Sequence, residues 1–114
     1  KQKTAYEIST RDWSSDVCSS DLISVVGNLV PADMKALIDA FDAGDLAAAR
    51  RLHGKLFTLC RDLLGMASNP IPIKAAMAMV GRDSGEVRLP LVSLEPPLAA
   101  KLRQVLVAYG LPVG

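Results

Sequence analysis

A lysine side chain can carry out covalent chemistry when its amine is neutral, because the amine then attacks a carbonyl carbon and forms a Schiff base. Lys74 stands out, since it follows two closely spaced prolines in the stretch Asn69-Pro70-Ile71-Pro72-Ile73-Lys74. A lysine becomes a nucleophile when a desolvating pocket or a nearby cation lowers its pKa. The sequence around Lys74 predicts a helix start and no such pocket, so we expect a structural or exposed lysine. Three further lysines fall in predicted helices and are expected to be solvated: Lys35, Lys55 and Lys101.

His53 is the single histidine of the chain, and it borders the apolar face of a predicted helix. No second histidine, cysteine or carboxylate follows it at the spacing of a metal site, so no metal is expected. Cys18 and Cys60 are too few for a disulfide framework. Cys60 lies on an apolar stripe and is interpreted as a small core residue. Arg50 and Arg51 could bind phosphate, but a solvated helix face is the preferred interpretation. The sequence therefore predicts no catalytic side chain, no metal and no cofactor.

Composition limits the possible functions further. The chain has 114 residues, of which 50% are hydrophobic and 4% aromatic, with a formal net charge of +1. This length suits one domain at most, and the near-zero charge gives no electrostatic reason to expect nucleic acid or an acidic membrane as a partner. No apolar run approaches the roughly 18 residues of a membrane span. We expect a reducing, cytoplasmic setting and no signal peptide.

The elements that must position these residues begin with a short β-branched run. Ile23–Val26 is predicted to be a strand that needs neighbouring strands outside this chain. Pro31 then opens a helix that ends at Gly44. The apolar residues of this helix repeat at a helical spacing and define one face: Met34, Leu37, Ile38 and Phe41.

A second, longer helix is predicted from Asp45, its N-cap, to about Leu64. Its apolar stripe consists of Ala49, Leu52, Leu56, Leu59, Cys60 and Leu63. The Asn69–Lys74 stretch then acts as a hinge, because its prolines prevent either flanking helix from continuing. We expect Asn69 to cap the third helix and Pro70 to occupy its first position. Gly81 ends this helix, whose apolar residues are Ile73, Ala76, Met77 and Val80.

The remaining residues are predicted to form a polar turn, an extended stretch and a last helix. The extended stretch is Val87–Leu91, in which Pro90 rules out a central strand. Ser93 is the expected cap of the last helix, with Pro96 and Pro97 in its first turn. Gly110 ends this helix, whose apolar stripe is Leu98, Leu102, Val105, Leu106 and Tyr109.

Lys1–Leu22 does not share the pattern of the rest. The segment KQKTAYEISTRDWSSDVCSSDL is polar, has no steady period and resembles a translated sequencing adapter. We expect it to be disordered and exclude it from the fold, as one would a fusion scar. The sequence is thus divided into residues 1–22, an adapter-like artefact, and residues 23–114, the folded part.

Residues 23–114 carry several motifs in a distinctive order: ISVVGN, AGDLAAARRLHGKL, NPIPIKAAMAMVG, RLPL and a last helix ending in YGL. This series resembles the C-terminal part of the 4-hydroxy-tetrahydrodipicolinate (dihydrodipicolinate) synthases. These enzymes belong to the pyruvate-dependent class I aldolases, together with N-acetylneuraminate lyase. The resemblance covers essentially all of residues 23–114. The combination of the Asn69–Lys74 motif with Arg88–Leu91 favours the synthase over its relatives, and we expect a positional role for Arg88.

The resemblance implies a fold that is mainly α as present: the last strand and C-terminal helices of a (β/α)8 TIM barrel, with the helices after the barrel as an extension. It implies an enzyme that condenses pyruvate with aspartate semialdehyde through a lysine Schiff base, in lysine and diaminopimelate biosynthesis. The family's catalytic lysine and tyrosine lie upstream of Ile23, so this chain alone is expected to be inactive. A homo-oligomer is expected for the whole enzyme.

One residue of the site can be carried over. The resemblance implies that the backbone carbonyl of Ile23 lies near bound pyruvate. The sequence departs from the family at Val26-Gly27, where a Thr-Ala or Thr-Ser pair is more usual. Two alternatives stay open: another pyruvate-dependent aldolase of the group, similar to N-acetylneuraminate lyase, and a non-catalytic helical interaction module.

Overall fold

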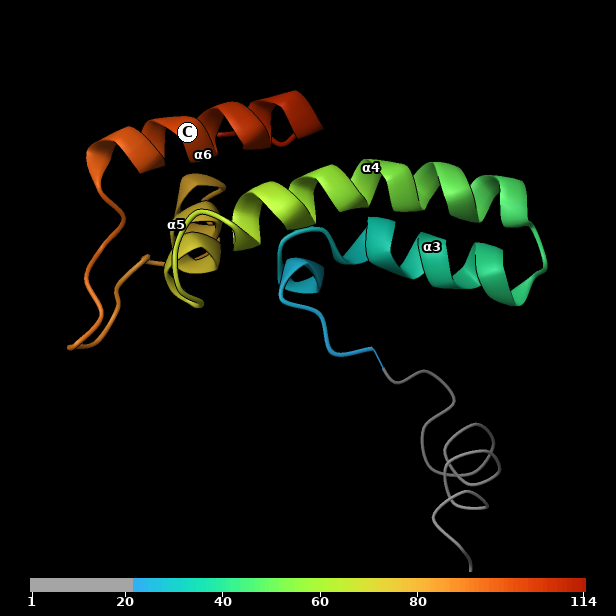
Figure 1. Cartoon of the computed structure of the whole chain (residues 1–114), viewed down its shortest axis with the longest axis horizontal. Helices are drawn as coiled ribbons and strands as arrows, with labels where there is room; N and C mark the ends of the chain where they lie inside the picture. The colour runs from blue at the N-terminus through green and yellow to red at the C-terminus, as the bar shows by residue number, and fades with distance from the viewer. Residues whose placement is uncertain (1–21) are drawn as a thin grey trace, which may run out of the picture.

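The computed structural model describes residues 22–114, and this part of the chain is helical. Helix α3 (Pro31–Asp42) and helix α4 (Leu46–Leu64) run side by side as a hairpin (Figure 1). Helix α6 (Pro96–Tyr109) lies along the C-terminal half of α4, and helix α5 (Ile71–Met79) packs against both. No helix within residues 22–114 combines the length and the hydropathy needed to cross a membrane. The expectation of a mainly helical chain is confirmed.

The strand expected at Ile23–Val26 is wrong. Within the described residues no strand forms, and the segment leads instead into a short 3-10 helix, η2 (Val26–Asn28). An isolated strand leaves its backbone groups without partners, whereas η2 satisfies several of them locally. The amides of Leu29 and Val30 both donate to the carbonyl of Val26, at 2.9 and 3.0 Å. Of the β-branched residues that suggested a strand, Val26 enters the helical core and Val25 packs against it, while Ile23 is exposed.

The α3–α4 hairpin follows the local signals of its sequence. Pro31 opens α3, which ends at Asp42, and the following Gly44 adopts φ 76°, a value that glycine tolerates best. Asp45 caps α4, because its side chain accepts a hydrogen bond from the amide of Ala48 at 2.9 Å. Gly65 follows the last residue of α4. The predicted start and end of both helices are confirmed.

The predicted start of α5 is wrong by one residue. Pro70 occupies the N-cap position, Pro72 lies in the first turn, and no side chain caps the helix. Asn69 precedes the N-cap, and the Asn69–Pro70 peptide bond is cis. A capping side chain must sit at the N-cap itself to reach the free amides of the first turn. Gly81, with φ 75°, ends this helix as expected.

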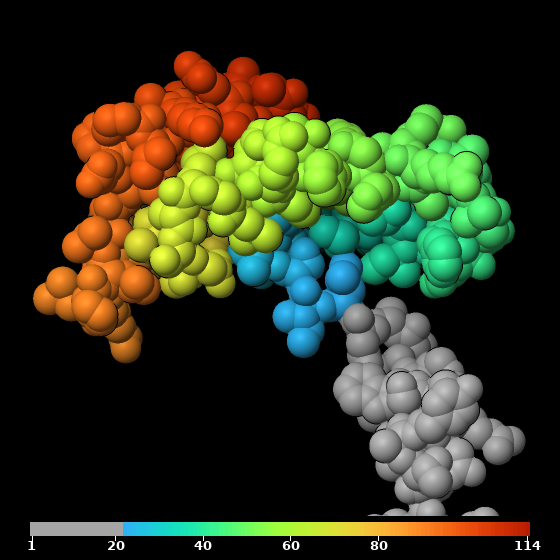
Figure 2. Space-filling model, viewed as in Figure 1, coloured from blue at the N-terminus to red at the C-terminus, as the bar shows by residue number. Residues whose placement is uncertain are grey.

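The segment between α5 and α6 projects from the helices as a long loop, drawn in orange in Figure 2. The extended stretch predicted at Val87–Leu91 is broken by a turn, in which the amide of Leu91 donates to the carbonyl of Arg88 at 3.0 Å. Ser93 does not cap α6, since Glu95 is the N-cap and no side chain bonds there. Pro96 and Pro97 do occupy the first turn, where a missing amide hydrogen is tolerated.

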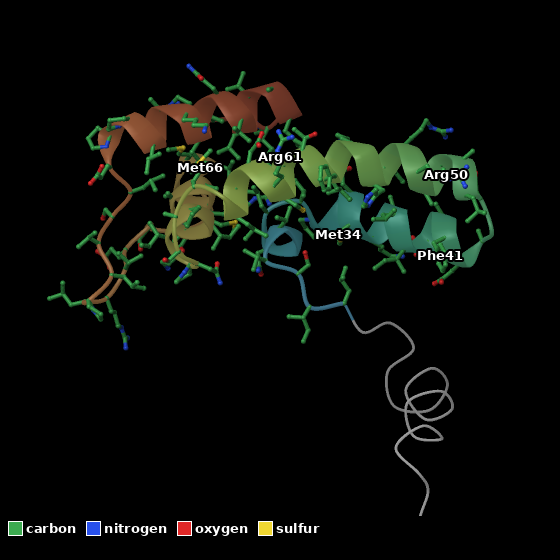
Figure 3. The ribbon with its side chains drawn as sticks, viewed as in Figure 1. Met34, Phe41, Arg50, Arg61 and Met66 are labelled. Atoms are coloured by element: carbon green, nitrogen blue, oxygen red, sulfur yellow. The ribbon has the colours of Figure 1, made fainter. Side chains whose placement is uncertain are left out.

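One apolar core joins η2 to the three C-terminal helices. Its most deeply buried members expose 1% of their surface or less, and they come from four different elements and the loop before α3. They are Val26, Leu29, Leu59, Leu63, Ala76, Leu102 and Leu106. Most of the residues predicted to form the apolar stripes of α4, α5 and α6 therefore face this core. Met66, in the loop after α4, packs against its edge (Figure 3).

Helix α3 differs from the others because none of its residues is fully buried. Met34 and Leu37 pack partly against the core, while Phe41 exposes 65% of its surface. Figure 3 shows the Met34 and Phe41 side chains along α3. The apolar face predicted for this helix is present, but residues 22–114 cover only part of it.

A polar cluster ties the first turn of α3 to α4 and α6. The Tyr109 hydroxyl donates to Asp33 Oδ2, and Lys55 Nζ lies 2.8 Å from the same oxygen. The Lys55 ammonium also sits 4.5 Å from the centre of the Tyr109 ring. The hydrogen bonds from Lys55 and then Tyr109 lower the pKa of Asp33. Burial, and then the bond to Asp33, raise the pKa of Tyr109. The cluster adds polar contacts among α3, α4 and α6, at the start of the packed α3–α4 hairpin.

We expect Asp45→Ala to lower the free energy of unfolding by about 1 kcal/mol, because it removes the one side-chain cap found on these helices within residues 22–114. Asn69→Ala serves as a matched control and should change this energy by no more than about 0.5 kcal/mol. Urea unfolding followed by circular dichroism measures both. Equal losses of unfolding free energy for the two variants would show that Asn69 does cap α5.

Asp33 predicts a specific dependence of stability on pH. Its folded-state pKa is lowered, so its contribution is present above the unfolded value of about 4 and is lost as pH falls through the folded pKa. Between about pH 5 and 3, the wild type should therefore lose about 1 kcal/mol more stability than Asp33→Asn. Asp39→Asn breaks only an exposed pair with Lys35 and should follow the wild-type profile. If the stability of wild type and Asp33→Asn changed with pH in parallel, Asp33 would not be the source of this pH dependence.

Candidate functional site

The segment around Ile23 is the part of the chain to which a substrate contact was assigned. The Ile23 side chain is fully exposed, whereas Val26 is 1% exposed. Between them the backbone folds back on itself: the Gly27 amide donates to Ser24 Oγ at 3.0 Å, and Asn28 Nδ2 donates to the Val25 carbonyl at 3.1 Å. Ile23 therefore stands at the free end of a compact turn whose other end is buried.

The unusual Gly27 fits this turn. A Cβ atom at this position would lie 3.3 Å from Ser24 Cβ, closer than most Cβ contacts. An alanine or serine here would require Ser24 to shift by a few tenths of an ångström. The Val26-Gly27 pair, which departs from the expected Thr-Ala or Thr-Ser, thus pairs a core-filling valine with a residue that leaves room for Ser24.

A broad hollow of about 650 Å³ lies between this turn and α3. Its lining includes Leu22, Ser24 and Gly27 from the turn and Met34 and Ile38 from the helix. Lys35 also borders it, but its ammonium is 2.6 Å from Asp39. The hollow has an apolar wall and two carboxylates, Asp39 and Asp42, and its lining includes no cysteine and one lysine, the paired Lys35. It can hold or orient a ligand but offers no covalent chemistry.

Lys74 lies in an ion pair, with its Nζ atom 2.7 Å from Asp83 Oδ2. Lys55 is likewise paired with Asp33. An amine held in an ion pair with a carboxylate is not free to attack a carbonyl carbon, as a Schiff-base lysine must. Lys101 is exposed on α6. Among residues 22–114, therefore, the lysines are placed as ion-pairing or surface residues.

The other candidate side chains of the sequence also lie apart from one another. His53 is exposed on α4, and its ring centre is 6.0 Å from that of Phe57. Arg50 and Arg51 are exposed on the same helix. Cys60 packs against the core, and burial raises the pKa of its thiol. In the described part of the chain, no three histidine, cysteine or acidic residues come together as a metal site.

Sequence reasoning missed two contacts just after the Ile23 turn, one to the backbone of Leu29 and one to the side chain of Asp33. Arg82 Nη1 donates to the carbonyl of Leu29 at 2.9 Å, and Tyr109 reaches Asp33. Each pair is separated by more than fifty positions in the sequence, so no local period or spacing could have indicated it. Arg82 was assigned only to a polar turn, and Tyr109 to an apolar stripe.

Comparison with known proteins identifies the chain. Residues 15–109 match the model of the dihydrodipicolinate synthetase family. The chain is 46% identical over 90 residues to 4-hydroxy-tetrahydrodipicolinate synthase of Syntrophus aciditrophicus (strain SB), and 48% identical over 91 residues to that of Syntrophobacter fumaroxidans. Each match covers 79% of this chain and 31% of the relative. The chain thus spans about a third of the length of these relatives. The family match begins before Ile23, and the boundary predicted at residue 22 stays a prediction.

Solved structures agree with the sequence matches. Dihydrodipicolinate synthase from Aquifex aeolicus superposes with a TM-score of 0.74 at 43% identity, covering 80% of this chain and 31% of that one. The enzyme from Thermotoga maritima gives a TM-score of 0.73 at 39% identity, covering 78% and 30%. Apart from the strand corrected above, the expected fold, the C-terminal helices of a (β/α)8 barrel enzyme, is confirmed. This chain belongs to the dihydrodipicolinate synthetase family.

Proposed function

We propose that this chain is the C-terminal part of a 4-hydroxy-tetrahydrodipicolinate synthase, which condenses pyruvate with aspartate semialdehyde through a lysine Schiff base. The observation that supports it most is the 46–48% identity, over about 90 residues, to enzymes of that name. The product of such an enzyme serves lysine and diaminopimelate biosynthesis, and a cytoplasmic location belongs to the same proposal. The chain itself carries no part of the covalent step.

The chemistry of the described residues supports inactivity of the chain alone. Schiff-base formation requires a neutral lysine held near the carbonyl carbon of pyruvate. Lys74 and Lys55 are paired with carboxylates, and Lys101 is exposed. In this proposal the Ile23 carbonyl accepts a hydrogen bond from, or orients, pyruvate that a lysine elsewhere in the enzyme has bound. A carbonyl of this kind contributes binding and orientation but forms no bond to substrate.

The uncovered face of α3 supports the view that a larger protein surrounds these helices. Met34, Ile38 and Phe41 follow one face of α3, yet none of them is buried among residues 22–114. An apolar face of this extent is usually covered by another protein surface. In the proposed enzyme the barrel covers it.

A further neighbour, 40% identical with a TM-score of 0.74, is the first monomeric dihydrodipicolinate synthase variant. We therefore keep homo-oligomerisation as part of the proposal.

Trapping with borohydride tests this function. The purified chain is incubated with pyruvate, reduced and weighed by intact-mass spectrometry, and we expect no stoichiometric adduct. Residues 23–114 are then joined to the preceding part of the Syntrophobacter fumaroxidans synthase, and this enzyme should carry the adduct on a lysine outside residues 23–114. Lys74→Arg, which keeps the pair with Asp83, should leave that adduct unchanged.

Three results would contradict the proposal. An adduct mapped to Lys74 in the chain alone would show that the chain contains the nucleophile. A folded joined enzyme that forms no adduct would favour the helical interaction module. A joined enzyme that forms the adduct but accepts N-acetylneuraminate, and not aspartate semialdehyde, would favour the other aldolase class.

A further inference from the structure

The backbone that follows Ile23 is built into the core of the C-terminal helices. Val26 and Leu29 are each 1% exposed and Val30 is 6% exposed. They belong to the same apolar cluster as leucines of α4 and α6. In Figure 1 this segment, drawn in blue, passes beside α5 and the C-terminal half of α4 before α3 begins. The helices after α3 therefore form the surface against which the turn that carries Ile23 packs.

Arg82 adds a polar contact to the end of this segment, just before α3. It lies just after α5, and its Nη1 atom donates to the Leu29 carbonyl at 2.9 Å. The guanidinium is a planar, rigid group whose charge strengthens a hydrogen bond to a neutral carbonyl. Because Leu29 is buried, this bond connects an exposed arginine to a packed part of the backbone. Arg82 thus connects the loop after α5 to the last residues before α3.

The surroundings of this contact are not filled by packed side chains. A hollow of about 270 Å³ separates the start of α3 from the C-terminal helices, and its lining includes Leu29, Asp33, Lys55, Arg82 and Tyr109. Across it, the bonds Arg82–Leu29 and Tyr109–Asp33 join the two sides. At this point, therefore, two hydrogen bonds supplement the packing of Leu29 and Val30 against the C-terminal helices.

We infer that Arg82 is a positioning residue for the pyruvate site: by fixing the Leu29 carbonyl it fixes the Val26–Val30 turn, and with it the Ile23 carbonyl. This inference rests on the function proposed above for Ile23. Arg82 acts through η2, whose Gly27 and Asn28 amides donate to Ser24 Oγ and to the Val25 carbonyl at 3.0 and 3.2 Å, next to Ile23. Local hydrogen bonds within the turn transmit the position of Leu29 to Val26, whose carbonyl accepts from the Leu29 amide at 2.9 Å.

Hydrogen exchange of the full 114-residue chain tests the contact directly. In Arg82→Ala, amides of residues 26–34 should exchange about tenfold faster, while amides within α6 keep their wild-type rates. Arg82→Lys retains a charged donor and should recover much of the protection. Arg51→Ala is the matched control, because Arg51, like Arg82, is an exposed arginine, and it lies on the solvated face of α4. Unchanged rates in residues 26–34 of Arg82→Ala, or an equal rise throughout the chain, would overturn the inference.

The joined enzyme described above tests the consequence for substrate. Arg82→Ala should raise the KM for pyruvate about fivefold and leave kcat within about twofold, because a misplaced carbonyl weakens binding before the chemical step. Arg82→Lys should restore the KM, and Arg51→Ala should match the wild type. A fall in kcat with unchanged KM indicates mere loss of folded enzyme and would overturn the inference.

The two proposals fail in different ways. An inactive wild-type joined enzyme contradicts the proposed function, whereas the exchange measurement on the 114-residue chain still decides whether Arg82 holds the turn. An active enzyme in which Arg82→Ala has the wild-type KM contradicts the positioning role alone.

Discussion

The structure depends on the withdrawal from water of a few aliphatic side chains where four elements meet. Leu59 and Leu63 of α4, and Leu102 and Leu106 of α6, are at most 1% exposed, and Val26 and Leu29 from the preceding loop pack with them. Each such side chain contributes about 1.5–3 kcal/mol relative to its exposed state. No other set of contacts in residues 22–114 joins elements so distant in sequence. The core fixes Val26 and Leu29 in the segment after Ile23, and the Arg82 hydrogen bond adds a polar contact to the same segment.

The same core explains why α3 is held differently from its neighbours. Its helix has no fully buried residue, so it is fixed by its two ends and by the hairpin with α4. At its start, Val30 enters the core, and Asp33 bonds to Lys55 and Tyr109. Its opposite face keeps Phe41 exposed. An element secured on one side and apolar on the other is suited to lie between two parts of a larger enzyme.

Local chemistry made much of the fold predictable from the sequence. Pro31, the cap at Asp45 and the glycines after three of the helices act within one turn of chain, so their effects could be foreseen. The predictions that failed concern residues whose conformation depends on contacts with other parts of the protein. Ile23–Val26 has the composition of a strand, but without neighbouring strands its valines join a helical core. Asn69 and Ser93 are suitable caps by type, yet the helices begin one and two residues beyond the position that each could serve.

In the candidate site, too, features set by neighbouring residues could be predicted and features set by distant contacts could not. That Lys74 lacks a pocket could be inferred from its neighbours in sequence, but its partner Asp83 could not. Arg82 and Tyr109 carry no signal of their role, because the atoms they bind come from the other end of the described chain. The function could be proposed only from resemblance, because no side chain of residues 22–114 is placed to carry out covalent chemistry.

Substitution of Leu29 tests most directly whether the loop after Ile23 and the C-terminal helices form one core. Leu29 is 1% exposed, whereas Leu64, a leucine of the same size, is 49% exposed at the end of α4. If the account is correct, Leu29→Ala lowers the free energy of unfolding by about 2–4 kcal/mol and Leu64→Ala by less than about 1 kcal/mol, each in a single cooperative transition. Equal, small losses for both variants, or a separate transition for residues 22–34, would contradict it.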